Sequence, residues 1–328
     1  MYSLDSIRVV HFEVTSKCQA RCPMCPRRMQ GGPMMPWVTL EEITIEQFKE
    51  WFPISFIQQL DRLFMCGNLG DPIIAKDTVP IFKYLREHNP NINLQMHTNG
   101  SARDAKFWQG LAETNVVVVF GLDGLEDTHS KYRINTDFNR IIENAKTFIN
   151  AGGEARWDML VFDHNKHQTD ECEELAYSLG FSKFQKKDSS RFKDGKYVVL
   201  DDTGTPIDIL YPTNRSIEFI EKAETSIKEE TPVITCKAKN RSELYIGANG
   251  AVTPCCWIDV EWLPPVSPER QDYMTKLGYF PNLNKQSLTE IFESQYFNEI
   301  ENSWGTSCLT TCKKQCGSFD KLGAQFES

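Results

Sequence analysis

The chain has 328 residues, of which 40% are hydrophobic and 25% are charged, and its formal net charge at pH 7 is -9. This length suits one barrel-sized domain with a smaller appended one. The acidic balance argues against nucleic-acid binding, and the sequence has no apolar run of about 18 residues and no charged-then-apolar N-terminal signal. We therefore expect a cytoplasmic protein without a nucleic-acid or membrane partner.

Short apolar segments rich in β-branched residues alternate with longer amphipathic segments from residue 7 to about 186. The expected strands are 7–14, 60–66, 92–97, 116–121, 155–162 and 181–185. The expected helices are 44–51, 76–88, 102–113, 137–151 and 169–179. Strands that alternate with helices in this way require right-handed crossovers and a parallel sheet. The pattern predicts an α/β fold, either a partial (β/α)6 TIM-like barrel or a doubly wound sheet.

Three cysteines stand within eight residues, directly after the first expected strand: Cys18, Cys22 and Cys25 in CQARCPMC. Their spacing supplies three thiolates, which can hold three irons of a four-iron cluster and leave the fourth iron open. A three-cysteine zinc site and a redox-active CxxC pair are the alternatives. Since the chain has 11 cysteines and no export signal, we expect metal ligands rather than disulfides.

This cysteine run resembles the signature of the radical SAM superfamily, although Met24 stands where the signature usually has an aromatic residue. The resemblance implies the partial (β/α)6 barrel, with the cysteine loop at the carboxyl ends of the strands. It also implies that the open iron binds S-adenosyl-L-methionine, which an electron from the [4Fe-4S] cluster cleaves to a 5'-deoxyadenosyl radical. The radical then removes a hydrogen atom from the substrate. Cys18, Cys22 and Cys25 would be both metal ligands and catalytic residues.

The resemblance also implies cofactor contacts in the loops that follow the next strands. CGNLGDPII stands where the family has a GGEP motif, which maps onto residues 69–72 with Leu in place of the first Gly and Asp in place of Glu. The expected cofactor-binding residues are Gly70, Asp71, Pro72, Thr98, Asn99, Asp123, Arg133 and Asn165. Taken alone, the Gly-Asp-Pro, Asn-Gly and Asp-Gly sequences are ordinary turns, and a solvated arginine is the slightly favoured alternative for Arg133. Cys66 and His97 are expected at the same strand ends, facing the active site.

A second cysteine-rich region begins at Cys236. Asn249-Gly250 predicts a hairpin turn that brings Cys236 and Cys255 toward each other. The spacing of Cys236, Gly250 and Cys255 resembles the opening of SPASM and twitch domains, which hold auxiliary four-iron clusters. The resemblance therefore implies a small C-terminal α+β domain with its own metal site.

Three further cysteines, Cys308, Cys312 and Cys316, follow an expected helix that starts with a capping-box pattern at residues 287–290. Five candidate ligands suit one auxiliary [4Fe-4S] cluster rather than two. We expect it to use Cys236, Cys255 and two of the last three cysteines, with Cys312 and Cys316 favoured and Cys308 as the alternative. A structural zinc site built from the same thiolates is the competing interpretation.

The expected organisation is a radical SAM partial barrel over 1–186, a connector over 187–235 that contains a helix near 216–229, and an auxiliary-cluster domain over 236–328. We expect a radical SAM oxidoreductase that modifies a peptide or protein, with an electron donor such as flavodoxin or ferredoxin. The barrel begins by residue 7, so no peptide-recognition domain is expected before it. A small-molecule alcohol or sugar dehydrogenase or epimerase, and a non-catalytic scaffold stapled by metal, are the alternatives.

Overall fold

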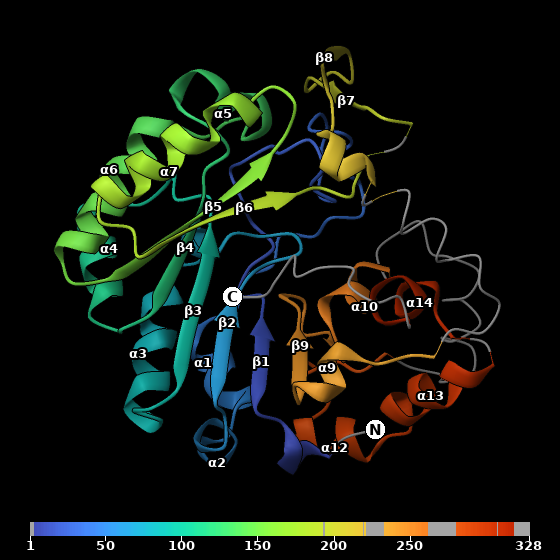
Figure 1. The fold of residues 1–328 in the computed structure, drawn as a ribbon. Coiled ribbons are helices and arrows are strands. Elements are labelled where there is room, and N and C mark those ends of the chain that lie inside the picture. The colour runs from blue at the N-terminus through green and yellow to red at the C-terminus, as the bar shows by residue number, and fades with distance from the viewer. Residues whose placement is uncertain are drawn as a thin grey trace.

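The computed structural model describes residues 3–192, 194–218, 220, 233–261, 280–306 and 308–317. Its central feature is a curved sheet in which six strands run parallel and lie side by side in chain order, with the last of them at one edge (Figure 1). These strands are β1 (Val9–Phe12), β2 (Arg62–Met65), β3 (Asn93–Thr98), β4 (Val117–Gly121), β5 (Glu154–Val161) and β6 (Lys183–Asp188). The predicted partial (β/α)6 barrel is confirmed, because sequential order without reversal is not the order of a doubly wound sheet.

Helices cover the outer face of this sheet (Figure 1). They are α1 (Ile45–Trp51), α2 (Ile54–Gln58), α3 (Thr78–His88), α4 (Ala105–Ala112), α5 (Glu126–Tyr132), α6 (Phe138–Asn150) and α7 (Thr169–Ser178), with 3-10 turns at Leu4–Ser6, Pro72–Ile74 and Lys166–Gln168. Side chains cap several of their N-termini, as Thr44 does for α1 and Asp137 for α6. The two short helices α2 and α5 were not expected. In the described part of the chain, no helix combines the length and the apolar character that crossing a membrane requires.

The two faces of the sheet differ in character because side chains alternate along each strand. Outward-facing residues such as Phe12 and Phe120 are fully buried with Trp108 and Phe148 of the helices in the main core. Inward-facing residues are more polar, and several of them line a narrow cavity between β3, β4, β5 and β6, among them His97 and Asp158. The inner face of the barrel therefore offers polar groups to a ligand, while the outer face holds the fold together.

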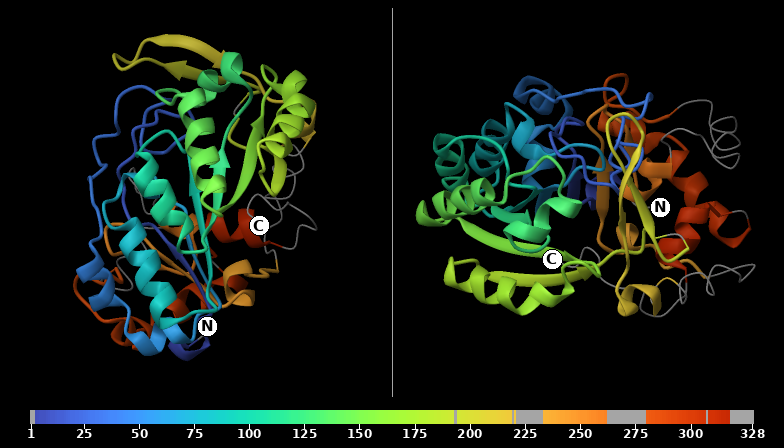
Figure 2. Two further views of the ribbon diagram at one scale, coloured as in Figure 1. Left: turned by 90° about the vertical axis from the view of Figure 1, so that its left-hand side faces the viewer. Right: turned by 90° about the horizontal axis from the view of Figure 1, so that it is seen from above.

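A two-stranded antiparallel hairpin, β7 (Tyr197–Leu200) and β8 (Pro206–Leu210), lies within the segment that was expected to be a plain connector. It stands at the carboxyl end of the barrel and contacts the cysteine loop, where the amide of Leu200 donates to the carbonyl of Gln30 over 2.9 Å (Figure 2). The Tyr197 hydroxyl also donates to the carbonyl of Pro23 over 3.1 Å. The helix expected near 216–229 lies largely outside the described residues.

The C-terminal region extends the barrel sheet instead of standing apart from it. Its elements are α9 (Lys237–Asn240), β9 (Glu243–Ile246), β10 (Val252–Thr253), α10 (Cys256–Glu261), α12 (Leu288–Glu293), α13 (Tyr296–Asn302), a 3-10 turn at Ser303–Gly305 and α14 (Thr310–Cys316). The hairpin predicted at Asn249-Gly250 is present, with Gly250 at φ +82°, and so is the capping box formed by Ser287 and Glu290. Strand β9 pairs parallel with β1, so the hairpin covers what would otherwise be a bare edge of the sheet.

Candidate active site

The loop that carries Cys18, Cys22 and Cys25 follows β1, at the carboxyl edge of the parallel strands. The buried guanidinium of Arg27 donates to the carbonyl of Cys18 over 2.9 Å, and the amide of Cys25 donates to the carbonyl of Cys22 over 3.0 Å. Met24, between the last two cysteines, is buried in an apolar cluster beside the loop. These local contacts hold three thiols on one short, folded stretch of backbone.

The three thiols lie in a setting that disfavours free thiolates. Burial raises the pKa of each of them, to about 11 for Cys22, and for Cys18 and Cys22 the charge of a neighbouring cysteine adds to the effect. A positively charged metal centre reverses this balance, because thiols that ligate a metal are deprotonated. The donor set of three close thiols therefore fits three corners of a four-iron cluster.

Asp71 ties the loops after β2 and β3 together beside the first cysteine. Its Oδ1 accepts from Thr98 Oγ1 over 2.8 Å, and its Oδ2 accepts from the Asn99 amide over 2.7 Å and from Asn99 Nδ2 over 2.6 Å. Asn99 Nδ2 also lies 3.6 Å from Cys18 Sγ. Burial raises the pKa of Asp71, while the four donors around it favour its charged form. Three of the predicted cofactor contacts, Asp71, Thr98 and Asn99, thus form one polar cluster beside the cysteine loop.

Gly70 and Pro72, on either side of Asp71, shape this loop. A Cβ on Gly70 would stand 1.6 Å from the carbonyl oxygen of Thr15, so only glycine allows the loop to approach the chain before Cys18 so closely. Pro72 opens the short helix Pro72–Ile74, which Asp71 caps through the amide of Ile73. Both residues therefore fix the path of the backbone. A loop that binds a ligand through backbone groups needs such a fixed path.

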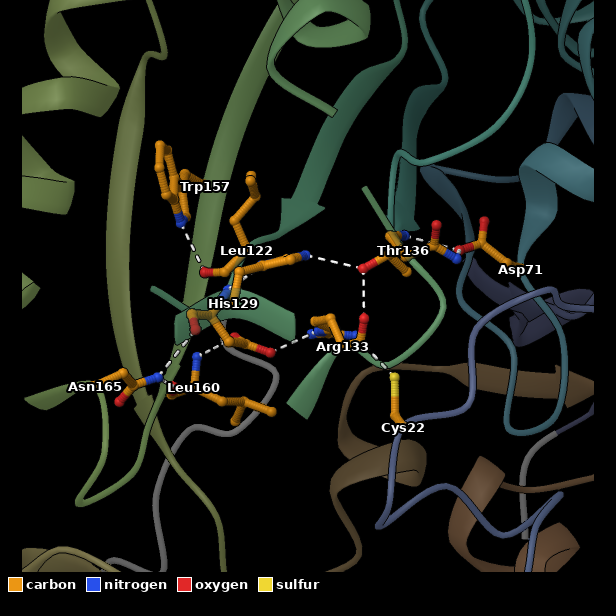
Figure 3. Close-up of polar contacts among 11 residues, drawn as sticks. Cys22, Asp71, Leu122, His129, Arg133, Thr136, Trp157, Leu160 and Asn165 are labelled. Carbon is orange, nitrogen blue, oxygen red and sulfur yellow. Dashed lines mark hydrogen bonds and ion pairs between the residues drawn. The ribbon is translucent and has the colours of Figure 1, made fainter. Parts of the chain in front are cut away.

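Arg133 joins the loop after β4 to the second cysteine (Figure 3). Its Nε donates to Asp123 Oδ2 over 2.6 Å, and one terminal nitrogen lies 3.9 Å from Cys22 Sγ. Burial works against the charged guanidinium, but the Asp123 carboxylate and Cys22 outweigh it and raise the pKa of Arg133. The guanidinium also packs against Gly121, since a Cβ added to this glycine would stand 2.6 Å from the nearest guanidinium nitrogen. Arg133 is therefore a fixed charge beside the cysteine loop, not a solvated arginine.

The side chain of Asn165 makes its hydrogen bonds to other groups inside the protein. Its Oδ1 accepts from the amide of Phe162 over 2.7 Å. Its Nδ2 donates to the carbonyls of Asp123 and Leu160 over 3.1 and 2.9 Å (Figure 3). Its side chain is fully buried and does not line the cavity described next. Direct contact between Asn165 and a cofactor stays a prediction, and the observed hydrogen bonds indicate that this residue supports the Asp123 loop instead.

A cavity of about 300 Å³ opens beside the cysteine loop at the carboxyl end of the barrel. Five of the predicted cofactor contacts line it: Gly70, Asp71, Thr98, Asn99 and Arg133. Other lining residues stand on or after the barrel strands, among them Cys66, His97, Asp158, Leu160, Lys187, Asp188 and Arg191. Cys66 and His97 face it, as the sequence predicted. Burial lowers the pKa of His97 to about 3, so this imidazole is neutral at physiological pH.

Four C-terminal cysteines line a second, narrow cavity: Cys236, Cys255, Cys312 and Cys316. A hydrogen bond from Cys236 lowers the pKa of Cys316, while burial raises the pKa of Cys255 to about 12. The rest of the wall is mostly apolar, with Ile234, Pro254, Trp257, Ile258, Ile300 and Trp304. Cys308 is buried nearby but does not line this cavity. The donor set fits a cluster with four protein thiolates, and it is the set favoured from the sequence.

Within the residues described, no three His, Cys, Asp or Glu side chains form a site for one metal ion.

Two buried charged residues of the site were missed in the sequence. Glu13 is 2% exposed at the end of β1, and Arg27 is 2% exposed within the cysteine loop. The signal for Glu13 was a single acidic residue inside an otherwise apolar strand segment, where a charge needs partners. Lys187 and Asp158, which both line the cavity, form an ion pair 2.6 Å long that joins two neighbouring strands, and no local pattern in the sequence indicated it.

Curated relatives match only part of the chain. A GTP 3',8-cyclase of Nautilia profundicola is 26% identical over 168 residues, which cover 48% of this chain and 48% of that protein. A cysteine-type anaerobic sulfatase-maturating enzyme of Clostridium novyi is 24% identical over 159 residues, which cover 44% of this chain and 40% of that protein. The match spans about half, or less, of the length of these relatives.

Solved structures share the fold over most of the chain. SuiB of Streptococcus suis bound to S-adenosylmethionine matches 90% of this chain and 68% of its own, at 14% identity and a TM-score of 0.60. Native anSMEcpe with bound AdoMet matches 89% of this chain and 82% of its own, at 16% identity and a TM-score of 0.58.

Two family models account for the two cysteine groups. The model of the Radical SAM superfamily matches residues 12–176, which is half of the chain, and the model of SPASM, an iron-sulfur cluster-binding domain, matches residues 236–317. The resemblance read from the cysteine spacing is thereby confirmed. The chain belongs to the radical SAM superfamily, whose members use a [4Fe-4S] cluster with S-adenosylmethionine, and it carries a SPASM iron-sulfur domain after its barrel.

Proposed function

We propose that this protein is a radical SAM enzyme that modifies a peptide or protein substrate. In this proposal Cys18, Cys22 and Cys25 hold the cluster within residues 1–186, and residues 236–328 hold one auxiliary [4Fe-4S] cluster through Cys236, Cys255, Cys312 and Cys316. Residues 187–235 connect the two parts. When bound, the first cluster and S-adenosylmethionine supply a 5'-deoxyadenosyl radical that abstracts a hydrogen atom from the substrate.

One observation carries the proposal: the three-thiol loop lies beside a polar cavity, and residues that line this cavity contact the thiols. Asn99 reaches Cys18, and Arg133 reaches Cys22. The four C-terminal thiols, by contrast, line a mostly apolar cavity of their own. This contrast supports an open, ligand-binding centre at the N-terminal site and a fully ligated centre at the C-terminal one.

The residues of the chain would position the cofactor in distinct ways. Arg133 keeps N–H groups beyond the one bound to Asp123, and these are suited to a carboxylate. Asp71 holds Thr98 and Asn99 against the loop at Gly70, whose backbone would face the cofactor. Walls of strand and loop around the cavity would exclude water and hold the substrate near the cofactor.

Two of the similar proteins support a peptide or protein substrate. SuiB of Streptococcus suis has been solved with a precursor peptide, and the relative from Clostridium novyi is a sulfatase-maturating enzyme. The GTP 3',8-cyclase of Nautilia profundicola supports a small-molecule substrate, which is a feature of the second candidate, a dehydrogenase or epimerase of a small alcohol or sugar. For either substrate, the first cluster needs a one-electron donor, for which a flavodoxin or ferredoxin is our proposal.

The decisive experiment reconstitutes the chain anaerobically with iron and sulfide, adds dithionite and S-adenosylmethionine, and measures 5'-deoxyadenosine. We expect formation above that of a Cys18→Ala, Cys22→Ala, Cys25→Ala triple variant, and about eight irons per chain in the parent. Formation equal to the triple variant would favour a non-catalytic scaffold. Stimulation by pooled peptides but not by small alcohols and sugars would separate the first candidate substrate from the second.

A further inference from the structure

Glu13 is a buried carboxylate at the end of β1 whose hydrogen bonds reach two separate parts of the chain. Its Oε1 accepts from the amides of Leu69 and Gly70 over 2.6 and 2.9 Å. Its Oε2 accepts from the hydroxyl of Tyr245 on β9 over 3.0 Å. Several donors converge on this carboxylate, so the protein compensates a charge that burial alone would make costly.

Asn68, beside those two amides, makes a second connection to the C-terminal domain. Its Nδ2 lies 3.1 Å from the Tyr245 hydroxyl, 3.1 Å from the carbonyl of Cys256 and 2.9 Å from Asp259 Oδ2. Cys256 and Asp259 belong to α10, which begins directly after Cys255 of the C-terminal cysteine cavity. A continuous set of hydrogen bonds therefore runs from loop 67–71 to the segment that carries an auxiliary-cluster ligand.

Loop 67–71 has little freedom to move independently of these partners. On its other side, the amide of Asp71 donates to the carbonyl of Lys17, next to Cys18, over 3.0 Å. A Cβ on Gly67 would stand 2.5 Å from Glu13 Oε1, so the loop packs directly onto the carboxylate. The loop is held between the N-terminal cysteine loop and the C-terminal domain.

We propose that Glu13 is a positioning residue for S-adenosylmethionine, and that Tyr245, Asn68 and Asp259 make the C-terminal domain part of the support of that site. The inference rests on the proposed function only in taking loop 69–72 as a cofactor contact. Glu13 does not line the cavity; in this role it fixes the two backbone amides and, through them, the direction of the loop. The C-terminal domain thereby acts on the first site through hydrogen bonds, besides holding its own cluster.

The test compares Glu13→Gln and Tyr245→Phe with Tyr296→Phe in the reconstituted full-length protein. Tyr296 is a matched control, because it is a fully buried tyrosine of the same domain that packs against Phe280 and Phe297, away from loop 67–71. The binding of S-adenosylmethionine is followed through the electron paramagnetic resonance of the reduced N-terminal cluster. We expect its Kd to rise about threefold to tenfold in Glu13→Gln and Tyr245→Phe, with iron content unchanged, and to stay constant in Tyr296→Phe.

A second measurement does not depend on the cofactor. Hydrogen exchange of the peptide that contains Leu69 and Gly70 should become about tenfold faster in the two network variants and not in the control. Unchanged exchange together with an unchanged Kd in Tyr245→Phe would overturn the inference, even if Glu13→Gln fails to fold. If the parent forms no 5'-deoxyadenosine, the proposed function fails, whereas the exchange result still decides the positioning role of Glu13.

Discussion

The two cysteine groups of this protein differ in how the chain assembles them. The N-terminal thiols stand on one loop of eight residues, beside a polar cavity of about 300 Å³. The C-terminal thiols come from three separate segments and share a narrow cavity with mostly apolar side chains, such as Ile300 and Trp304. An open, polar surrounding like that of the N-terminal thiols suits a centre that accepts a ligand and a substrate. A narrow, apolar surrounding like that of the C-terminal thiols suits a centre whose ligands all come from the protein.

The largest expected effect separates the two sites by metal content. Cys255→Ala should remove the auxiliary cluster and lower the iron content from about eight to about four per chain. The N-terminal site should keep its cluster and still cleave S-adenosylmethionine. Iron analysis and 5'-deoxyadenosine formation check both parts. Cys256→Ala is the control, since this neighbour does not line the cavity, and it should keep about eight irons; equal losses in both variants would contradict the assignment.

The buried ion pair of the N-terminal site should have the next largest effect. Arg133→Ala leaves the fully buried Asp123 carboxylate without its partner, which should lower the free energy of unfolding by about 3–5 kcal/mol. Urea denaturation of the cluster-free protein measures this change. Arg133→Lys keeps the charge but loses the planar fork, so we expect a smaller loss, and equal losses in both variants would show that the charge is not what matters.

Asp71→Asn tests the polar junction beside Cys18. The carboxylate accepts four hydrogen bonds, and an asparagine would turn an N–H group toward donors, so the free energy of unfolding should fall by about 2 kcal/mol. Asp104→Asn is the matched control, because Asp104 caps α4 and asparagine caps a helix equally well. If the free energy of unfolding fell as much in the control as in Asp71→Asn, the hydrogen bonds of Asp71 would have no special importance.

The smallest expected effect concerns Cys308, a candidate ligand from the sequence that does not line the C-terminal cavity. Cys308→Ala should leave the iron content unchanged and lower the free energy of unfolding by about 1 kcal/mol, because it trims a small buried side chain. Cys312→Ala should instead lose the auxiliary cluster. Iron analysis of the two variants side by side decides which one is the ligand, and loss of iron in Cys308→Ala would reverse our choice.

Local sequence was sufficient to predict the strands and longer helices of the barrel, because each has a periodicity that its own residues carry. The hairpin at Asn249-Gly250 and the capping box at Ser287 could be predicted for the same reason, since both depend on neighbouring residues. The short helices α2 and α5 and the hairpin of β7 and β8 could not, because short elements have weak patterns and depend on what they pack against.

By itself, the sequence determined the three-thiol loop, since Cys18, Cys22 and Cys25 are neighbours in the chain and stand on one short loop. Only the tertiary structure decided that β9 pairs with β1, that Cys312 and Cys316 join Cys236 and Cys255 while Cys308 stays outside, and that Glu13 links loop 67–71 to Tyr245. These contacts join residues far apart in sequence. They form because an unpaired sheet edge has to be covered and because buried polar groups need hydrogen-bond partners. Neither requirement can be recognised from neighbouring residues in the sequence.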